Sequence, residues 1–228
     1  MTNPWQELRS SDESYILEMD REAIRRHNDS VSDAKKKVIV ASIPEPFIGN
    51  PKSARLVLLG LNPGHSPEDE KSHRNPEFQN AMFLNLRQKL EEYPFYPLNP
   101  KPAFRESGAA KWWLKRTCKL QIESGLDDQM FAERLLVIEW FPYHSQRSGL
   151  APKRVCASQE YSFQLARQML QEKKLVVRMR SEKHWTEAHR QFGELPSLKN
   201  PQCGHVTRGN TEERLFEKIV KALKGTDN

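Results

Sequence analysis

The stretch RLVLLGLNPGHS, residues 55–66, decides the fold because its character changes in the middle. Residues 56–61 are nearly all large and apolar, which is typical of a parallel strand covered on both faces. Asn62, Pro63 and Gly64 then form a tripeptide that favours a turn. We therefore expect a buried strand that ends at Asn62, although such a tripeptide is more often structural than functional.

Two more continuously apolar runs lie at residues 135–141 and 175–179. Helical patterns lie between and after the three runs, at residues 82–90, 163–170, 185–192 and 210–225. In the last pattern, Asn210 is the expected N-cap and Gly225 the expected stop. Strands that alternate with helices predict an α/β fold, with three α/β/α layers around a central, mostly parallel four-stranded sheet.

The chain is expected to divide near residue 52. Residues 1–52 predict an N-terminal appendage, helical and then extended, packed on the core. Residues 53–225 predict the α/β domain. The segment at 91–104, EEYPFYPLNPKPAF, carries several prolines and aromatic rings, so it favours an ordered loop over a linker.

The composition sets broad limits on function. The 228 residues are 37% hydrophobic, enough for a proper core, and carry a net charge of +6, which permits a polyanionic partner without demanding one. Three scattered cysteines without a CxxC pair favour a reduced, cytoplasmic protein with neither a disulfide framework nor a zinc ribbon. No apolar run approaches the ~18 residues of a membrane span, and the N-terminus lacks a signal-peptide core. We expect a soluble cytoplasmic monomer that does not bind a membrane.

Each apolar run ends on polar residues. Ligands of open parallel sheets bind outside the carboxyl ends of the strands, so these residues are expected to share one site. The first run ends at Asn62, Pro63, Gly64 and His65; the second at Glu139, Tyr143, His144 and Ser145; the third at Arg178, Arg180 and His184. A fourth short segment, residues 195–210, adds Asn200, Gln202, His205 and Arg208.

Glu139 interrupts the run LLVIEWF. A buried carboxylate costs several kcal/mol unless it is paired or hydrogen-bonded, so Glu139 is expected to face a polar cavity or a cation. The alternative is that the strand simply ends at Ile138. His144 and Ser145 suggest nucleophilic catalysis, but a G-x-S-x-G elbow is absent, which disfavours a serine hydrolase.

Two tryptophans and three lysines have ordinary explanations. Trp112 and Trp113 are expected to pack a helix against the sheet rather than to touch a ligand. The lysines at residues 35–37 are expected to be a solvated surface run.

With GLNPG at 60–64 and NPQ…TRGN between 200 and 210, the sequence resembles the uracil-DNA glycosylase superfamily. It is most similar to the mismatch-specific uracil/thymine glycosylase-like branch, whose first motif reads G-[IL]-N-P-G. The resemblance follows the element order from about residue 44 to 223, while motif similarity is confined to the two short stretches. It implies the fold of that superfamily and hydrolysis of the N-glycosidic bond of a base flipped out of DNA, which leaves an abasic site.

The resemblance also implies roles for individual residues. Asn62 would hold the attacking water and Asn200 would open the second motif, which closes on the DNA backbone. Glu139 would read the base edge, and Phe78 or Phe83 would stack on the base. The remaining contacts expected in the site are Gly60, Leu61, Pro63, Gly64, His65, Tyr143 and His144 for the substrate, and Arg147, Lys153, Arg154, Gln202, His205 and Arg208 for DNA.

The sequence also departs from the family. The first-motif aspartate of the uracil-specific branch is absent, and the second motif does not read H-P-S-P. An ionised Glu139 would accept a hydrogen bond from an exocyclic amine, as on cytosine or adenine, and would repel the carbonyls of uracil. The iron–sulfur branches use four cysteines, so three imply no cluster, and we expect no metal or cofactor.

The chemistry agrees with the resemblance. An oxocarbenium-like sugar needs little from a strong nucleophile, so an asparagine that orients water can suffice. Pro63 and Gly64 would restrict the turn and let the backbone approach the ligand. Three functions remain open: a DNA glycosylase that acts on a damaged, mismatched or modified base, a non-catalytic nucleic-acid-binding protein with the same fold, and a small-molecule hydrolase that uses Asn62, Glu139 and His144.

Overall fold

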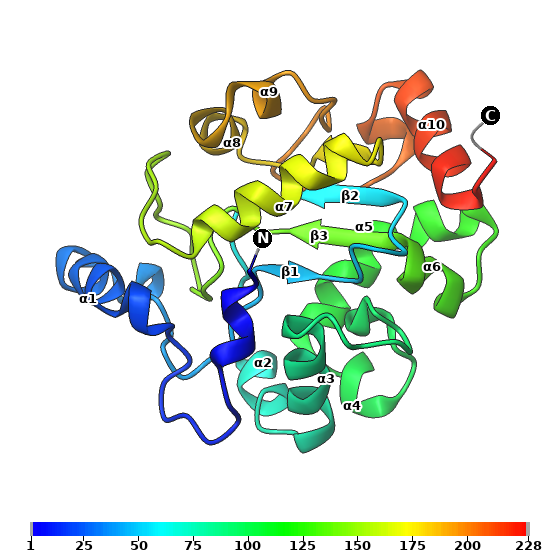
Figure 1. Cartoon of the computed structure of the whole chain (residues 1–228). Coiled ribbons are helices and arrows are strands. Elements are labelled where there is room, and N and C mark those ends of the chain that lie inside the picture. Colours follow the sequence, from blue (N-terminus) through cyan, green and yellow to red (C-terminus); the bar gives the residue numbers. More distant parts are fainter. Residues whose placement is uncertain (1, 227–228) are drawn as a thin grey trace.

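A computed structural model describes residues 2–226 of the chain, and its centre is a four-stranded sheet (Figure 1). The strands are β1 (Phe47–Ile48), β2 (Leu56–Leu59), β3 (Leu135–Ile138) and β4 (Leu175–Arg178). Their order is β1-β3-β2-β4, with β2 parallel to both β3 and β4 and β1 antiparallel to β3. Strands β2 and β3 are buried at every residue, because their apolar side chains are covered on both faces.

The α/β fold is confirmed, and the three apolar runs form parallel strands as expected. The fourth strand is different. It comes from Phe47 and Ile48 in the expected appendage, so the sheet is mixed. The segment at 195–210 contributes only an isolated bridge between Ser197 and Arg178. Prolines at 196 and 201 lack the N–H that a longer ladder needs.

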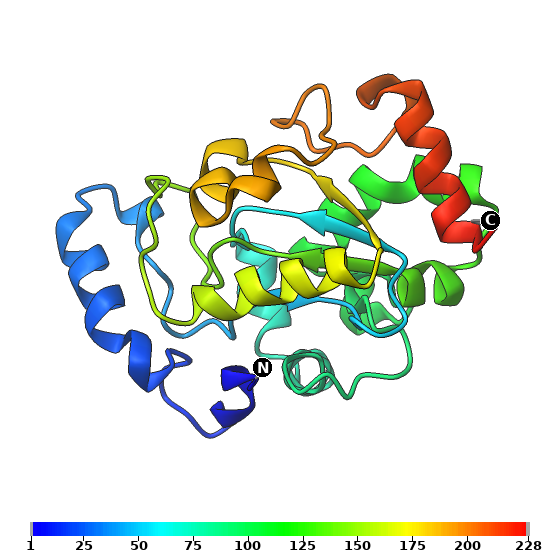
Figure 2. The same ribbon diagram turned by 45° about the horizontal axis from the view of Figure 1, so that its top comes forward.

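Helices cover both faces of the sheet, which fits three α/β/α layers; Figure 2 shows the same layers from a second direction. Helix α7 packs on β3 and β4, and α10 packs on α5 and β2. The α-helices are α1 (Arg21–Ser30), α2 (Pro67–Ser72), α3 (Pro76–Leu86), α4 (Pro102–Arg105), α5 (Gly108–Ser124), α6 (Asp128–Arg134), α7 (Gln159–Gln171), α8 (Glu182–Ala188), α9 (Arg190–Gly193) and α10 (Glu213–Lys224). No helix among residues 2–226 is long and apolar enough to cross a membrane.

The last helix matches its predicted end but not its predicted start. Gly225 ends α10 in the left-handed region at φ 72°, as expected for a C-terminal glycine. Glu212, rather than Asn210, is the residue at the N-cap. Asn210 instead donates to the carbonyls of Asn200 and His205, so it closes the preceding loop.

The N-terminal residues share the core of the α/β domain. Trp5 and Ile43 are fully buried. The Tyr143 hydroxyl, which follows β3, donates to Asp20 at 2.6 Å and accepts from the backbone N–H of Leu17 at 3.3 Å. Among the described residues, the N-terminal segment therefore packs on the core and, through β1, extends its sheet.

The segment at 91–104 is an ordered part of the core. Phe95, Tyr96 and Phe104 are buried. Phe95 meets Trp113 edge to face, with ring centroids 5.1 Å apart. The Tyr96 hydroxyl donates to Glu45, which brings this loop against the segment before β1.

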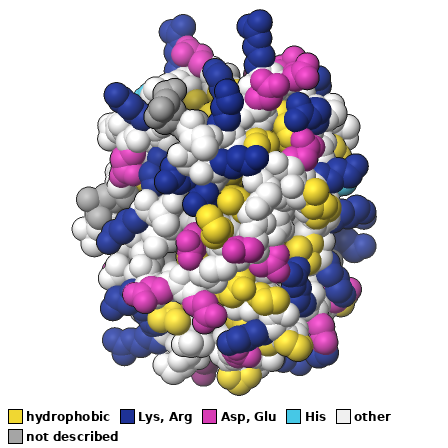
Figure 3. Space-filling model, turned by 90° about the vertical axis from the view of Figure 1, so that its right-hand side faces the viewer, with side chains coloured by type: hydrophobic (Ala, Val, Ile, Leu, Met, Phe, Trp, Pro, Cys, Tyr) yellow, Lys and Arg dark blue, Asp and Glu magenta, His cyan; other side chains and the backbone are white. Residues whose placement is uncertain are grey.

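The face that carries α6 and α10 lies at the amino ends of β2 and β3. Lysine and arginine side chains alternate there with aspartate and glutamate (Figure 3). The net positive charge of the chain is therefore not gathered into one continuous basic patch on this face.

Candidate functional site

A cavity of about 380 Å³ opens at the carboxyl ends of β2 and β3, the edge where the sequence predicts a site. The loop after β2 supplies its wall from Leu61 to Asp69. The loop after β3 supplies Glu139 and His144, and Arg180 follows β4. The start of α5 and the segment beside β1 complete the lining with Gly108, Ala109, Trp112, Trp113, Glu45 and Ile48.

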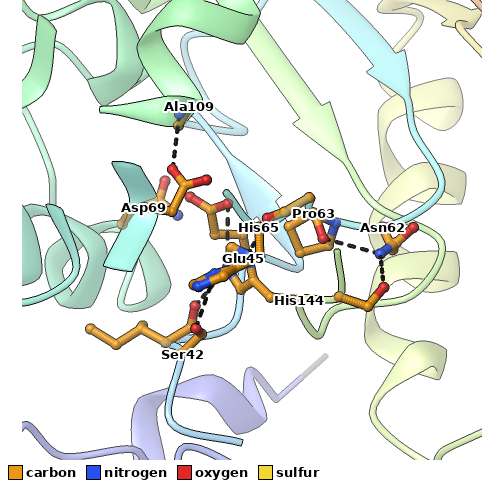
Figure 4. A network of polar contacts seen from close by, with 12 residues as sticks. Ser42, Glu45, Asn62, Pro63, His65, Asp69, Ala109 and His144 are labelled. Carbon is orange, nitrogen blue, oxygen red and sulfur yellow. Dashed lines mark hydrogen bonds and ion pairs between the residues drawn. The ribbon is translucent and has the colours of Figure 1, made fainter. Parts of the chain in front are cut away.

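Asn62 lines the cavity with its side-chain amide held in one orientation (Figure 4). Its Nδ2 donates to the carbonyl of Pro63 and to Oγ of Ser145, both at 3.0 Å. Ser145 in turn donates to the carbonyl of Arg147 at 3.0 Å. A carbonyl only accepts, so these contacts fix which end of the amide is nitrogen. Oδ1 of Asn62 accepts no hydrogen bond from residues 2–226 and is available to a water molecule.

Glu139 is buried, with 6% of its surface exposed, and lines the same cavity, as expected. Its carboxyl lies directly against Gly60, where any Cβ would collide with it. Burial raises the pKa of Glu139 to about 8, although nearby Arg180 opposes the shift. The group is therefore mostly protonated at neutral pH, which differs from the ionised carboxylate that the sequence led us to expect. Oε2 is buried without a hydrogen-bond partner in the described chain.

Two histidines, His65 and His144, line another wall of the cavity, and His73, which is not part of the lining, packs against both. The ring centroids of His65, His73 and His144 lie between 5.1 and 5.8 Å apart. Nδ1 of His144 is 2.6 Å from the carbonyl oxygen of Gly64, and Nε2 is 2.9 Å from that of Ile43. Burial lowers the pKa of each of the three histidines. They are therefore mainly neutral at pH 7.

Glu45 joins the histidine wall and was not predicted from the sequence. Its Oε2 is 3.6 Å from Nε2 of His144, and its other oxygen accepts from Tyr96. Burial raises the pKa of Glu45 to about 8, against the lowering effect of the Tyr96 hydrogen bond. A mostly protonated Glu45 therefore lies beside a mainly neutral His144 at neutral pH. No local pattern could have revealed it, since 98 residues separate the two partners.

Asp69 positions the start of α5 and was also missed. It accepts hydrogen bonds from the backbone and hydroxyl of Ser66, at 2.8 and 2.7 Å, and from the backbone N–H of Ala109 at 3.1 Å. Gly108 lies against these groups so closely that a Cβ would collide with them. The capping-box pattern at 66–69 was the available signal. Through Asp69, the loop after β2 and the first turn of α5 form one wall.

Tryptophans, not the expected phenylalanines, supply the aromatic surface. Phe78 is fully buried and stacks on His73, and Phe83 packs on Tyr15; neither lines the cavity. Trp112 and Trp113 do line it. Trp113 also packs in the core, but Trp112 is only half-buried, because α5 begins at the cavity and turns this ring toward it.

The other predicted site residues lie elsewhere. Tyr143 is turned toward Asp20 in the N-terminal segment. Asn200 is exposed, and its Oδ1 accepts from the backbone N–H of Gln202 within its own turn.

Among the predicted DNA contacts, Arg154 pairs with Glu160 at 3.3 Å and Arg208 with Glu123 at 2.9 Å. Of the predicted DNA contacts, Arg147 and Lys153 are exposed, form no ion pair within the described chain and lie in the loop after β3. Gln202 and His205 belong to the loop before α10.

The cavity has no arrangement suited to a metal. Within the described part of the chain, no group of three or more histidine, cysteine, aspartate or glutamate side chains is arranged to hold a metal ion. The site offers a fixed amide oxygen, a mostly protonated carboxyl group, a half-buried indole ring and one glutamate–histidine pair. These groups can bind and orient a polar ring compound and a water molecule.

Comparisons with family models, with curated proteins and with solved structures find no match for this chain.

Proposed function

We propose that this protein is a DNA glycosylase that hydrolyses the N-glycosidic bond of a base flipped out of DNA. One observation carries the proposal: the free Oδ1 of Asn62 and the unpartnered carboxyl of Glu139 line a single cavity of about 380 Å³. The resemblance assigns the water to Asn62 by its motif, and base reading to Glu139 by its place near the end of the middle strand. An extruded base entering the cavity would be read by its edge, as base-flipping enzymes do.

Asn62 acts by orienting water. Both hydrogen bonds that Nδ2 can donate go to Pro63 and Ser145. Oδ1 is the atom of the amide that remains, and it accepts a hydrogen bond from a water molecule. As the bond between C1′ and the base nitrogen breaks, its electron pair leaves with the base and the sugar becomes cationic. The water oxygen then bonds to C1′, loses a proton, and the base gains one. Fixing the water before the reaction removes an entropic cost from the transition state.

Glu139 selects the base by its hydrogen-bonding edge. A protonated carboxyl offers one O–H donor and one carbonyl acceptor. This pair is complementary to a ring carbonyl next to a ring N–H, the edge that uracil, thymine and hypoxanthine share. Because burial raises the pKa of Glu139 to about 8, the repulsion expected between an ionised carboxylate and uracil does not apply at neutral pH. We therefore assign the substrate to this class of bases rather than to cytosine or adenine.

Trp112 supplies the surface against which a flipped base would stack. Base–aromatic stacking contributes roughly 1–3 kcal/mol per base and accepts any ring. The indole therefore adds affinity while Glu139 adds selectivity.

The test incubates the protein with end-labelled duplexes that carry uracil, thymine or hypoxanthine mismatches, followed by alkali. Strand breaks at the uracil, thymine or hypoxanthine position support the proposal if Asn62→Ala abolishes them while it keeps the melting temperature of the wild type. Binding of every duplex without breaks would instead indicate a nucleic-acid-binding protein. A parallel incubation with free nucleosides detects the third function: base release there, without DNA cleavage, indicates a small-molecule hydrolase.

A further inference from the structure

Two arginines lie side by side at the rim of the cavity, next to Trp112. Arg116 is one turn further along α5, and its guanidinium carbon lies 3.7 Å from the centroid of the Trp112 ring. Arg180 follows β4, and its guanidinium carbon lies 5.3 Å from the same ring. Arg180 also lines the cavity itself. The indole thus holds two cations close to the site where Glu139 is buried.

Neither arginine forms an ion pair within the described chain, and Nε of each is buried without a hydrogen-bond partner. The carboxyl of Glu139 lies near Arg180, but burial keeps it mostly protonated at neutral pH. Arg116 donates one side-chain hydrogen bond, to the carbonyl of Trp112 at 3.0 Å. The guanidinium of Arg180 donates none to residues 2–226. Cationic donors left unsatisfied in this way are unfavourable, so the arrangement calls for an anion.

Arg178 shows that the same region can satisfy an arginine fully. Two residues before Arg180, it donates to the carbonyls of Phe192 and Gly193 and pairs with Glu182 at 3.1 Å. The free guanidinium of Arg180 is therefore not a general property of this edge of the sheet.

Gly204 keeps the space beside the two arginines open. It adopts φ +64°, and a Cβ built there would lie 3.0 Å from Nη2 of Arg180 and 3.6 Å from Nε of Arg116. The loop that follows α9 thus approaches both cations with a residue that has no side chain. Burial and the neighbouring Arg180 both lower the pKa of Arg116, as expected for two adjacent cations with no anion between them.

We propose that Arg116 and Arg180 together bind one phosphate group at the rim of the cavity. Two guanidinium forks match the several oxygens of a phosphate, and charge-assisted hydrogen bonds would occupy the unpartnered Nε donors. The phosphate belongs to a nucleotide whose base enters the cavity toward Glu139. It is either a phosphodiester of a DNA strand, which rests on the proposed function, or the phosphate of a free nucleotide, which does not.

The first experiment measures the melting temperature of the full chain with inorganic phosphate, deoxyuridine monophosphate and deoxyuridine. Ligands that bind the folded state raise the melting temperature. The two phosphate-bearing compounds are expected to stabilise the wild type more than deoxyuridine does. Arg116→Gln and Arg180→Gln each weaken phosphate binding about tenfold, and the double variant abolishes the shift. Arg167→Gln is the matched control, because Arg167 is also partly buried but is paired with Glu160.

The free protein gives a readout that separates binding from a structural role. Arg180→Gln removes one of two like charges and no hydrogen bond, so the melting temperature without ligand stays the same or rises. A clear fall in Arg180→Gln would assign this arginine to the fold. Arg116→Gln does not serve for this readout, because it also loses the contacts with Trp112. A phosphate-induced shift that persists in the double variant, or no shift in the wild type, would overturn the phosphate site.

The second experiment identifies the source of the phosphate with a fluorescently labelled 20-nucleotide duplex that carries one central uracil mismatch. Loss of duplex binding in both single variants supports the phosphodiester. Binding of deoxyuridine monophosphate without competition by the duplex keeps the phosphate site but rejects the proposed action on DNA. The two proposals therefore fail by different results.

Discussion

The two walls of the cavity treat their polar groups in opposite ways. On one, here called the closed wall, Glu45, Asp69 and His144 meet partners within the protein (Figure 4). On the other, the open wall, Oε2 of Glu139 and Nε of Arg180 are buried without a partner among residues 2–226. Oδ1 of Asn62 accepts no hydrogen bond from these residues, because only its Nδ2 is engaged. Both walls are built from loops at the same edge of one sheet.

The difference indicates which residues serve a ligand. A buried polar atom without a partner costs roughly 1–3 kcal/mol. The atoms of this kind at Trp5, Trp140 and Ser162 do not line the cavity, whereas those of Glu139 and Arg180 lie together where a ligand can satisfy them. The closed wall gives the cavity its shape, and the open wall contacts the substrate. Four changes test this division, starting with the largest expected effect.

Gly60→Ala should break the open wall. The added Cβ would collide with the carboxyl of Glu139, a side-chain end without a hydrogen bond that can move into the cavity. The stability cost should therefore stay at or below about 1 kcal/mol, while a displaced Glu139 should lower base excision about 100-fold. Urea unfolding and single-turnover cleavage measure the two effects. Gly64→Ala is the control for stability, because a Cβ at Gly64 meets nothing within 4 Å.

Glu139→Gln should change the pH dependence of excision. Wild-type activity needs the protonated carboxyl, which is present below its pKa of about 8 and lost above it. At pH 9 we expect roughly a tenfold fall from the value at pH 7, because about one group in ten remains protonated. Glutamine offers a donor and an acceptor at every pH, so the variant should keep activity and lose the alkaline fall. The same fall in both proteins would assign it to another group.

Stability provides an independent check on Glu139. Its folded pKa of about 8 is raised above the ordinary 4.5, so folding binds a proton between these values. The contribution of the protonated Glu139 to the stability of the fold is thus fully present below pH 4.5 and is lost as the pH rises through 8. The free energy of unfolding in urea should decline less steeply from pH 5.5 to 8.5 in Glu139→Gln than in the wild type.

Ser145→Ala should have a smaller effect, because it loosens Asn62 without removing it. The variant loses one of the two hydrogen bonds that orient the amide, and the contact with the Pro63 carbonyl remains. We expect kcat to fall about three- to tenfold with little change in KM, since the water is positioned less well. A loss as large as that of Asn62→Ala would assign a direct chemical role to the serine.

Arg208→Gln should have the smallest effect and sharpens the assignment of the DNA contacts. Arg208 pairs with Glu123 at 2.9 Å, so its charge is already neutralised within the protein. We expect duplex affinity to change less than about twofold, against about tenfold for Arg180→Gln. Fluorescence anisotropy at several salt concentrations measures both. A larger loss for Arg208→Gln would restore it to the DNA interface.

The sequence predicted the parts of this protein that depend on local chemistry. The apolar runs became β2, β3 and β4, because side chains without in/out alternation need cover on both faces. The turn after β2 placed Asn62 at the carboxyl end of a strand. A carboxyl group within an apolar run placed Glu139 in a cavity. Each of these inferences uses residues within one short segment.

Tertiary structure alone decided which distant residues meet. Strand β1 joined the sheet from the expected appendage, Glu45 met His144, and Arg116 met Arg180 beside Trp112. Periodicity reports whether a side chain is buried but not what it faces, so the charge state of Glu139 and the identity of the stacking ring were not readable in advance. The sequence thus determined the sheet edge that carries the candidate site. The folded chain decided which of its polar groups are satisfied and which are left for a ligand.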